Sequence, residues 1–232
     1  MRTSYKAPID YFLSEGRDNL RDCLSAAFSA AVRHHISKII IFTAKGVGLR
    51  IALEEFCSLT EYEHLKLIGV TFPQGKIFKE KDGKEFTVDI PSEDAEFFRR
   101  SGVNIVRAHL PFDPISAAFA HHGILGQDVT MIGEALSIFG GSMSLCVQAA
   151  LLACDAGEVV FGEHAISLTS DTAILARMAP TRQLLRDFVV REIICKPVIL
   201  TIGKREDPFL PAADDVSIDL GKVAPKALPP GS

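Results

Sequence analysis

The chain has 232 residues, of which 47% are hydrophobic and 23% charged, and it carries a formal net charge of -4. This length suits one large or two small domains, and the acidic balance gives no sign of a nucleic-acid-binding surface. The longest apolar runs fall short of the roughly 20 residues of a membrane span, and the N-terminal residues lack the apolar core of a signal peptide. We therefore expect neither a nucleic acid nor a membrane as a partner.

The cysteines bear on the cellular compartment and on metal binding. All of them lie in apolar surroundings, and no two form a CxxC pair. This pattern predicts reduced core residues of a cytoplasmic protein, and the spacing does not suit zinc, so we expect no metal site. The cysteines are Cys23, Cys57, Cys146, Cys154 and Cys195.

The first elements in chain order alternate between helix and strand. Apolar residues that step by three and four predict a helix over 14–35. A short β-branched run predicts a buried strand over 38–43, and a helical segment over 49–58 follows it. A second buried strand of the same kind is predicted over 65–71.

The middle of the chain combines a hairpin with another helix and strand. An Asp-Gly dipeptide between strand-like residues predicts a β-hairpin insertion over 76–90, which would serve as a lid, an edge extension or a subunit contact. An acidic start at Ser92 and a glycine at Gly102 predict the two ends of a helix. A third strand is predicted over 103–108.

Two helices are predicted over 129–139 and 142–156, split by a pair of glycines. The second is apolar nearly all round, which is typical of a helix buried at a sheet or at a subunit interface. Three strand-like segments follow, at 165–169, 172–178 and 188–195.

The alternation of strands and helices predicts an α/β fold with a mostly parallel sheet, because parallel neighbours need helical crossovers. We expect a single domain over 1–202, with the hairpin as an insertion. The segment 203–232 holds five prolines and few large apolar residues. It is therefore predicted to be a tail that is extended or disordered.

The loop after the strand over 38–43 is a candidate phosphate cradle. Thr43 offers a hydroxyl, Lys45 a positive charge, and Gly46 and Gly48 allow close approach of backbone N–H groups to an anion. The loop matches neither a Walker A motif nor a dinucleotide fingerprint, since Ile51 stands where the third glycine would be. A plain turn that needs glycines for its geometry remains the alternative.

Other predicted strand ends add small polar and aromatic residues to the same edge of the sheet. Ligands of such sheets bind at the carboxyl ends of the strands. The convergence fits a small anionic ligand with a planar part, which Phe72 or Phe112 would cover. The further candidate contacts at these ends are Phe72, Gln74, Gly75, His109, Thr169, Ser170, Asp171 and Thr172.

The stretch KIIIFTAKGVGLRIALEEF, residues 38–56, resembles the strand–loop–helix of the pyruvate kinase C-terminal domain, which holds an effector phosphate in that enzyme. The loop of that family reads T-x-[ST]-G-x-[ST]-A, and here it runs from Thr43 to Leu49. Over about residues 9–197 the chain resembles stand-alone proteins built from this domain. Further matching pieces are Tyr11-Phe12 with Gly16 and Asn19, Ser101-Gly102-Val103-Asn104, residues 146–157 and Asp171-Thr172-Ala173.

This resemblance implies a three-layer α/β sandwich and a homo-oligomer. It also implies a phosphate-bearing ligand, with flavin mononucleotide (FMN) as the best candidate. The phosphate contacts that it implies fall on Thr43, Lys45, Gly46, Val47 and Gly48.

The chain departs from the family pattern around the expected pocket. Lys45 replaces a small hydroxyl residue, Gln148 replaces a glutamate, and the family's HHxGF is here Phe72-Pro73-Gln74-Gly75. The family's longer glycine-rich segment before Asp-Thr-Ala is shortened to Leu168-Thr169-Ser170.

Candidates for catalysis are few. The barrel domain that carries pyruvate kinase chemistry is absent, so that route to phosphoryl transfer is excluded. His109, at a strand end, is the better acid–base candidate. His121-His122 with Asp113 and Asp128 form a weaker one, since adjacent histidines rarely share a metal.

Other reactive residue types are expected to have structural roles. His34-His35 ends a helix, where cationic side chains suit the helix dipole, and Asp155 is expected to cap or pair. Cys146 and Cys154 are expected to be core residues rather than nucleophiles.

Three functions stay open from the sequence. The first is a binding protein for FMN or a sugar phosphate, acting as a sensor or carrier. The second is an enzyme that uses the same pocket, either a flavin oxidoreductase or a phosphoester-acting enzyme. The third is an oligomeric interaction module with an empty pocket, in which the apolar helix over 142–156 builds the oligomer.

Overall fold

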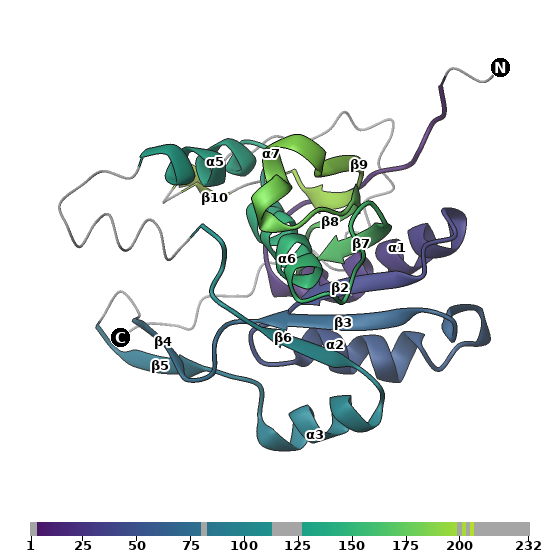
Figure 1. Ribbon diagram of the computed structural model, residues 1–232, viewed down its shortest axis with the longest axis horizontal. Coiled ribbons are helices and arrows are strands. Elements are labelled where there is room, and N and C mark those ends of the chain that lie inside the picture. Colours follow the sequence, from purple (N-terminus) through teal and green to yellow (C-terminus); the bar gives the residue numbers. More distant parts are fainter. Residues whose placement is uncertain (1–3, 80–82, 113–126, 199–200, 203–204, 207–232) are drawn as a thin grey trace, which may run out of the picture.

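A seven-stranded sheet forms the centre of the computed structural model, which describes residues 4–79, 83–112, 127–198, 201–202 and 205–206 (Figure 1). The strands are β1 (Asp10–Phe12), β2 (Lys38–Phe42), β3 (Lys66–Thr71), β4 (Lys76–Lys79), β5 (Glu85–Val88), β6 (Asn104–Arg107), β7 (His164–Leu168), β8 (Ala173–Arg177), β9 (Val189–Pro197), β10 (Thr201–Ile202) and β11 (Arg205–Glu206). The α-helices are α1 (Leu20–Arg33), α2 (Val47–Ile51), α3 (Ser92–Arg100), α5 (Gln127–Ser137), α6 (Met143–Asp155) and α7 (Leu184–Asp187). Shorter helical segments are η1 (Arg17–Asn19), η2 (Ala52–Phe56), η3 (Thr60–Tyr62) and η4 (Thr181–Gln183).

The sheet has the strand order β1-β9-β8-β7-β2-β3-β6. All neighbouring pairs are parallel except the two that β8 makes with β7 and β9. The turn between β7 and β8 spans only residues 169–172, too short for the crossover that a parallel pair needs, so β8 must run back against β7. The mixed α/β fold with a mostly parallel sheet is therefore confirmed.

The centre of the sheet is buried on both faces, as the unbroken apolar runs predict. Ile39, Ile40 and Ile41 of β2 are fully buried. Ile39 and Ile41 enter the core on one face of the sheet, and Ile40 enters the core on the other. A strand without apolar–polar alternation is what a sheet covered on both faces requires.

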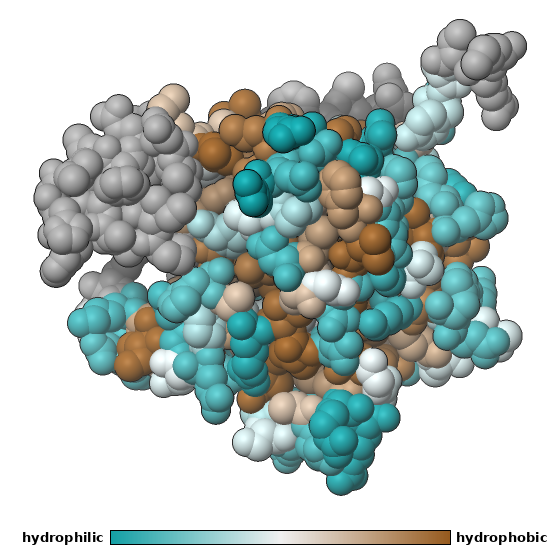
Figure 2. Space-filling model, viewed as in Figure 1, coloured by the Kyte–Doolittle hydropathy of each residue, from teal (hydrophilic) through white to brown (hydrophobic). Residues whose placement is uncertain are grey.

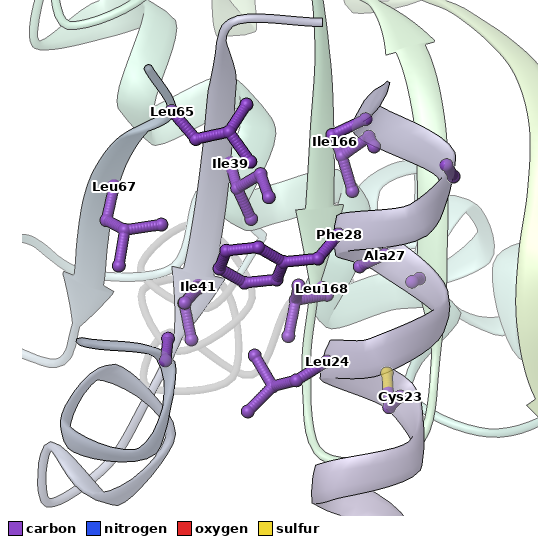
Figure 3. Packing of buried hydrophobic residues seen from close by; sticks show 14 of the residues in the cluster. Cys23, Leu24, Ala27, Phe28, Ile39, Ile41, Leu65, Leu67, Ile166 and Leu168 are labelled. Atoms are coloured by element: carbon purple, nitrogen blue, oxygen red, sulfur yellow. The ribbon is translucent and has the colours of Figure 1, made fainter. Parts of the chain in front are cut away.

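The first face carries α1, α2 and α3. In Figure 3, Phe28 of α1 points between Ile39 and Ile41 of β2 on one side and Ile166 and Leu168 of β7 on the other. The ring of Phe28 also meets Phe56 and Tyr62, with ring centroids 4.8 and 5.1 Å apart. Full burial of a side chain of this size contributes about 1.5–3 kcal/mol to the free energy of unfolding.

The second face carries α6, whose residues from Cys146 to Ala153 are all buried. They pack against Ile40, Ile68, Val70 and Ile174 of the sheet. The apolar composition of this helix is thus explained inside one chain, and the expected homo-oligomer stays a prediction. With helices on both faces, the fold has three layers.

The hairpin over 76–90 is present as an antiparallel pair, β4 with β5. Figure 1 shows it beside the main sheet, separate from it. Phe78 packs against Phe72 and Phe86 in one aromatic row, while Ile77 stays 54% exposed. Figure 2 shows this apolar surface on the hairpin, in contrast to the hydrophilic surface over α3.

Several details differ from the sequence-based expectations. β1 was not predicted, the helix expected over 49–58 begins at Val47, and its second half is the π-helical turn η2.

All five cysteines are free, and no helix in the described part of the chain is long and apolar enough to cross a membrane. Of the predicted tail, only 205–206 lie within the described residues, paired with 201–202.

α1 and α3 end with the same arrangement of backbone hydrogen bonds. After α1, His35 N donates to Val32 O at 3.2 Å and Ile36 N donates to Ala31 O at 2.8 Å. After α3, Gly102 N and Val103 N make the corresponding bonds. The residue past the cap is left-handed in both, with φ of 53° at His35 and 74° at Gly102. Only at α3 is it the glycine that this conformation favours.

Exchanging these two residue types tests the cost of the left-handed histidine. We expect His35→Gly to raise the free energy of unfolding by about 0.5–1 kcal/mol, because glycine relieves the Cβ strain but leaves the unfolded chain more freedom. Gly102→His should lower it by a similar amount, since open space surrounds position 102. Urea unfolding measures both, and a loss of stability in His35→Gly would contradict the assignment of strain.

Candidate functional site

A cavity of about 540 Å³ opens at the carboxyl ends of β2 and β7. We call it the carboxyl-edge cavity. Five segments supply its walls: η1 with the start of α1, the β2–α2 loop, α2, the start of α6 and the β7–β8 turn. The lining residues are Arg17, Asp18, Leu20, Arg21, Phe42, Thr43, Ala44, Lys45, Val47, Gly48, Ile51, Ser142, Leu145, Thr169 and Ser170.

The strand order explains why the cavity lies at this point. From β2 the chain continues through α2 to β3, on one side, whereas from β7 it turns to β8, on the other side. The loops that leave two adjacent parallel strands therefore diverge and leave a crevice between them. Ligands of open α/β sheets bind at such switch points, outside the carboxyl ends of the strands.

The β2–α2 loop is shaped by internal contacts. Gly46 N donates to Thr43 Oγ1 at 3.0 Å, and Gly46 itself has a φ of 86°. A Cβ at position 46 would lie 2.8 Å from the Phe98 ring, and one at position 48 would lie 3.2 Å from Ile41. Both glycines thus have a structural reason, and the amide of Gly46 is already used within the loop.

Two long helices begin at the cavity. The first turn of α1 supplies Leu20 and Arg21 to the lining, and α6 supplies Leu145, with Ser142 at its N-cap. Neither helix has a side-chain hydrogen bond at its cap, and α6 has no acidic residue in its first turn. The positive dipole ends of both helices therefore lie at this end of the molecule, where they favour an anion. At α1 this effect is reduced by Asp22 in its first turn, and Leu20 N already donates to Arg17 O.

Basic side chains outnumber acidic ones in the lining. Arg17 and Lys45 are exposed and make no ion pair among the described residues. Arg21 is held by Glu55, with Nη2 to Oε1 at 2.9 Å, and this hydrogen bond lowers the pKa of the exposed Glu55 carboxyl. Asp18 is the acidic member of the lining. Arg17 and Lys45 are therefore the charges available to a ligand.

The remaining wall is apolar. Leu20, Phe42, Val47, Ile51 and Leu145 supply it from both faces of the sheet. A cavity of this volume with an apolar wall and a few convergent polar groups matches the usual site for a small molecule.

The structure brings together most residues predicted on the loop and on the β7–β8 turn. Three more lie directly behind the lining: Gly46, Asp171 and Thr172. Asp171 Oδ2 accepts Gly16 N at 2.9 Å, and Thr172 Oγ1 accepts Ser142 N at 3.0 Å, so these two residues hold the cavity walls in place. The predicted residues that line the cavity are Thr43, Lys45, Val47, Gly48, Thr169 and Ser170.

Four predicted contacts lie elsewhere. Phe72 packs between Phe42 and Phe78, with ring centroids 5.2 and 5.0 Å away. Gln74 and Gly75 are exposed in the turn before β4. His109 is exposed after β6, the edge strand, and does not line the cavity.

Phe112, the other aromatic residue considered as a cover, is buried in the core beside α6, where its backbone N donates to Gln148 Oε1 at 3.1 Å. The histidine and aspartate candidates Asp113, His121 and His122 lie outside the described residues, and Asp128 lies in α5.

The reactive residue types expected to be structural have structural surroundings. Burial raises the pKa of the Cys146 thiol well above its ordinary value, and burial likewise raises the pKa of Cys154. Asp155 accepts hydrogen bonds from the backbone and the hydroxyl of Thr181. His34 caps α1 and meets Glu192 at 2.9 Å.

Sequence reasoning missed several lining residues, among them Arg17, Arg21, Ser142 and Leu145. Arg17 lies in η1 and Arg21 in the first turn of α1, both before β2 in the chain, and only the packed fold shows that these segments reach the loop. The signal for Ser142 was the glycine pair before a helix without an acidic first turn.

No family model matches the sequence. Among solved structures, the chain has a likeness to Cryptosporidium parvum pyruvate kinase, with 14% sequence identity and a TM-score of 0.34. The likeness covers 72% of this chain and 24% of the pyruvate kinase chain. The chain thus spans about a quarter of the length of that enzyme.

A pair of glycine substitutions tests how the loop is built. We expect Gly46→Ala to lower the free energy of unfolding by about 2–5 kcal/mol, because it adds backbone strain to a clash with Phe98. Gly75→Ala is the matched control, with a φ of 73° in open space, and should cost only the strain, about 1 kcal/mol. Equal losses in urea unfolding would show that Phe98 leaves room at position 46.

Proposed function

We propose that the protein binds a small phosphate ester with an apolar or planar organic part in the carboxyl-edge cavity, as a sensor or carrier. The observation that supports this most directly is the convergence of Arg17, Lys45 and the N-termini of α1 and α6 on one cavity. Apolar side chains complete the lining. FMN combines both chemistries and is the ligand we test first.

The two unpaired basic residues of the lining suit a phosphate. Lys45 projects from the β2–α2 loop and Arg17 from η1, so cations from two separate segments would meet the same group. The Thr43 hydroxyl accepts the Gly46 amide through its oxygen, which leaves its proton free to donate. α2 adds the amides of Val47 and Gly48, since its first backbone bond runs from Arg50 N to Gly46 O.

The apolar residues of the lining suit the organic part of the ester. Phe42 is half-buried at the end of β2, and Leu145 faces the same space from α6. A flavin ring would replace water at these side chains, whereas a free phosphate would leave them exposed. A cavity that served inorganic phosphate alone would have no use for this wall.

Binding is favoured over catalysis by the chemistry of the lining. Among the described residues it contains no histidine, cysteine or glutamate, and its one carboxylate, Asp18, is exposed. The acid–base candidate His109 lies outside it. A general acid or base must come within hydrogen-bond reach of the reacting group.

The resemblance of the β2–α2 stretch to the phosphate-holding loop of the pyruvate kinase C-terminal domain supports the same ligand chemistry. On that basis we also propose that the chain belongs with the stand-alone proteins built from this domain. Lys45 would then supply by charge what the small hydroxyl residue of the family supplies by hydrogen bonding.

The first test compares two ligands that differ only in the phosphate. Isothermal titration calorimetry with FMN and with riboflavin should show FMN binding at least about tenfold more tightly, the effect of one charge-assisted contact. Mass analysis of whatever the denatured protein releases identifies an occupant that co-purifies. Equal affinity for the two flavins, or no binding of FMN, would contradict the proposal.

The second test removes the cations and spares the loop. Lys45→Ala and Arg17→Ala should each weaken FMN binding about tenfold and leave riboflavin binding unchanged. Both side chains are exposed, so neither change should alter the thermal midpoint of unfolding. Arg186→Ala, an exposed arginine of α7 outside the lining, is the control. Gly46 is left intact, because its substitution would disturb the packing of Phe98.

A further inference from the structure

A second cavity lies at the opposite end of the sheet, where the parallel strands begin. Its volume is about 610 Å³, and we call it the amino-edge cavity. It contains three histidines and an arginine, and none of its residues lines the carboxyl-edge cavity. The side chains that bear on its chemistry are Tyr5, His34, His35, Glu163, His164 and Arg191.

The fold brings most of these residues together from three places in the chain. The turn after α1 carries His34 and His35, β7 begins with His164, and Arg191 lies on β9. The pairing of Ile39 with Ile166 sets β2 and β7 in register, so the segment after α1 lies beside the start of β7. The sheet thus fixes the positions of His164 and Arg191, and the end of α1 fixes the turn with His34 and His35.

The carboxylates at this edge already have cationic partners. Glu192 is buried and contacts Arg33 Nη2 and His34 Nε2, each at 2.9 Å. Glu163 contacts Lys38 Nζ at 2.9 Å. Their negative charges are therefore matched before any ligand arrives.

The remaining basic side chains are unpaired. Among the described residues, the side chains of His35, His164 and Arg191 make no hydrogen bond or ion pair, and all three are exposed at the cavity. On β8, Arg177 stands opposite His164 in the register, but its guanidinium is held by Asp187. A ligand in the cavity thus meets one guanidinium and two imidazoles that can offer it hydrogen bonds.

The backbone at His35 supplies an independent reason to look for a ligand. His35 holds a left-handed φ of 53°, at a position where the equivalent turn after α3 has glycine. Residues in such strained backbone conformations are enriched at ligand sites, where contacts between the side chain and the ligand offset the strain. Here the imidazole of His35 lines the cavity.

We propose that the amino-edge cavity binds a small dianion, a phosphate ester or a dicarboxylate, between Arg191, His35 and His164. Arg191 offers the forked donors that pair with carboxylate or phosphate oxygens. His35 and His164 add imidazole nitrogens at the same cavity, which can donate hydrogen bonds to further oxygens of the dianion. His34 and Tyr5, whose rings lie 6.4 Å apart, form one wall.

The test uses sulfate and the full chain carrying Arg17→Ala and Lys45→Ala, so that the carboxyl-edge cavity does not compete. Sulfate titrations followed by imidazole NMR signals should shift His35 and His164 and leave exposed His64 unmoved. Repeating the titration with succinate distinguishes a dicarboxylate source from a phosphate-like one.

Variants assign the effect to the cavity. Arg191→Gln and His164→Gln should each weaken sulfate binding about fivefold or more, while His64→Gln should not change it. His35→Gly should weaken binding although it stabilises the fold, which separates loss of the ligand contact from loss of structure. Sulfate shifts that are absent from His35 and His164, or that persist unchanged in Arg191→Gln, would overturn the proposal.

Discussion

β2 pairs through its backbone with β3 on one side and with β7 on the other, while its side chains enter the cores on both faces of the sheet. Three isoleucines without solvent contact make this possible. Because both faces must be covered, α1, α2 and α3 take one side and α6 takes the other. The loop after β2 is thereby held between helices from both layers. The packing of these helices in the core sets the positions of the residues around the loop.

The course of α1 links the two cavities. It precedes β2 in the chain and packs against β2 and β7, so its first turn lies at their carboxyl ends and its last turn at their amino ends. The positive end of its dipole meets the cavity with Arg17 and Lys45. The negative end carries Arg33, which suits the dipole there, and both Arg33 and His34 contact the buried Glu192. The two ends of one helix thus take part in both cavities.

Local patterns are enough to predict β2, β3 and the two buried faces, since an apolar run or a helical repeat reports burial directly. β1 gives no such signal, because it has three residues and its side chains are exposed or half-buried. The loop residues of the carboxyl-edge cavity were predicted because they adjoin a strand, whereas Arg17 and Leu145 arrive from other elements. Phe72 and His109 were placed with them only by the rule that strand ends share an edge, and that rule does not say how far along the edge each strand lies.

The pairing of β1 with β9 joins residue 10 to residue 195. Every other strand of the main sheet lies between these two in the chain, so the edge that β1 completes cannot form until β9 has been synthesised. Closing so long a loop carries a large entropic cost, and contacts of this separation slow folding. Within the described sheet β1 pairs with β9 alone, so it stays unpaired until β9 is available. The completion of this edge is therefore a late step of folding that must follow the synthesis of β9.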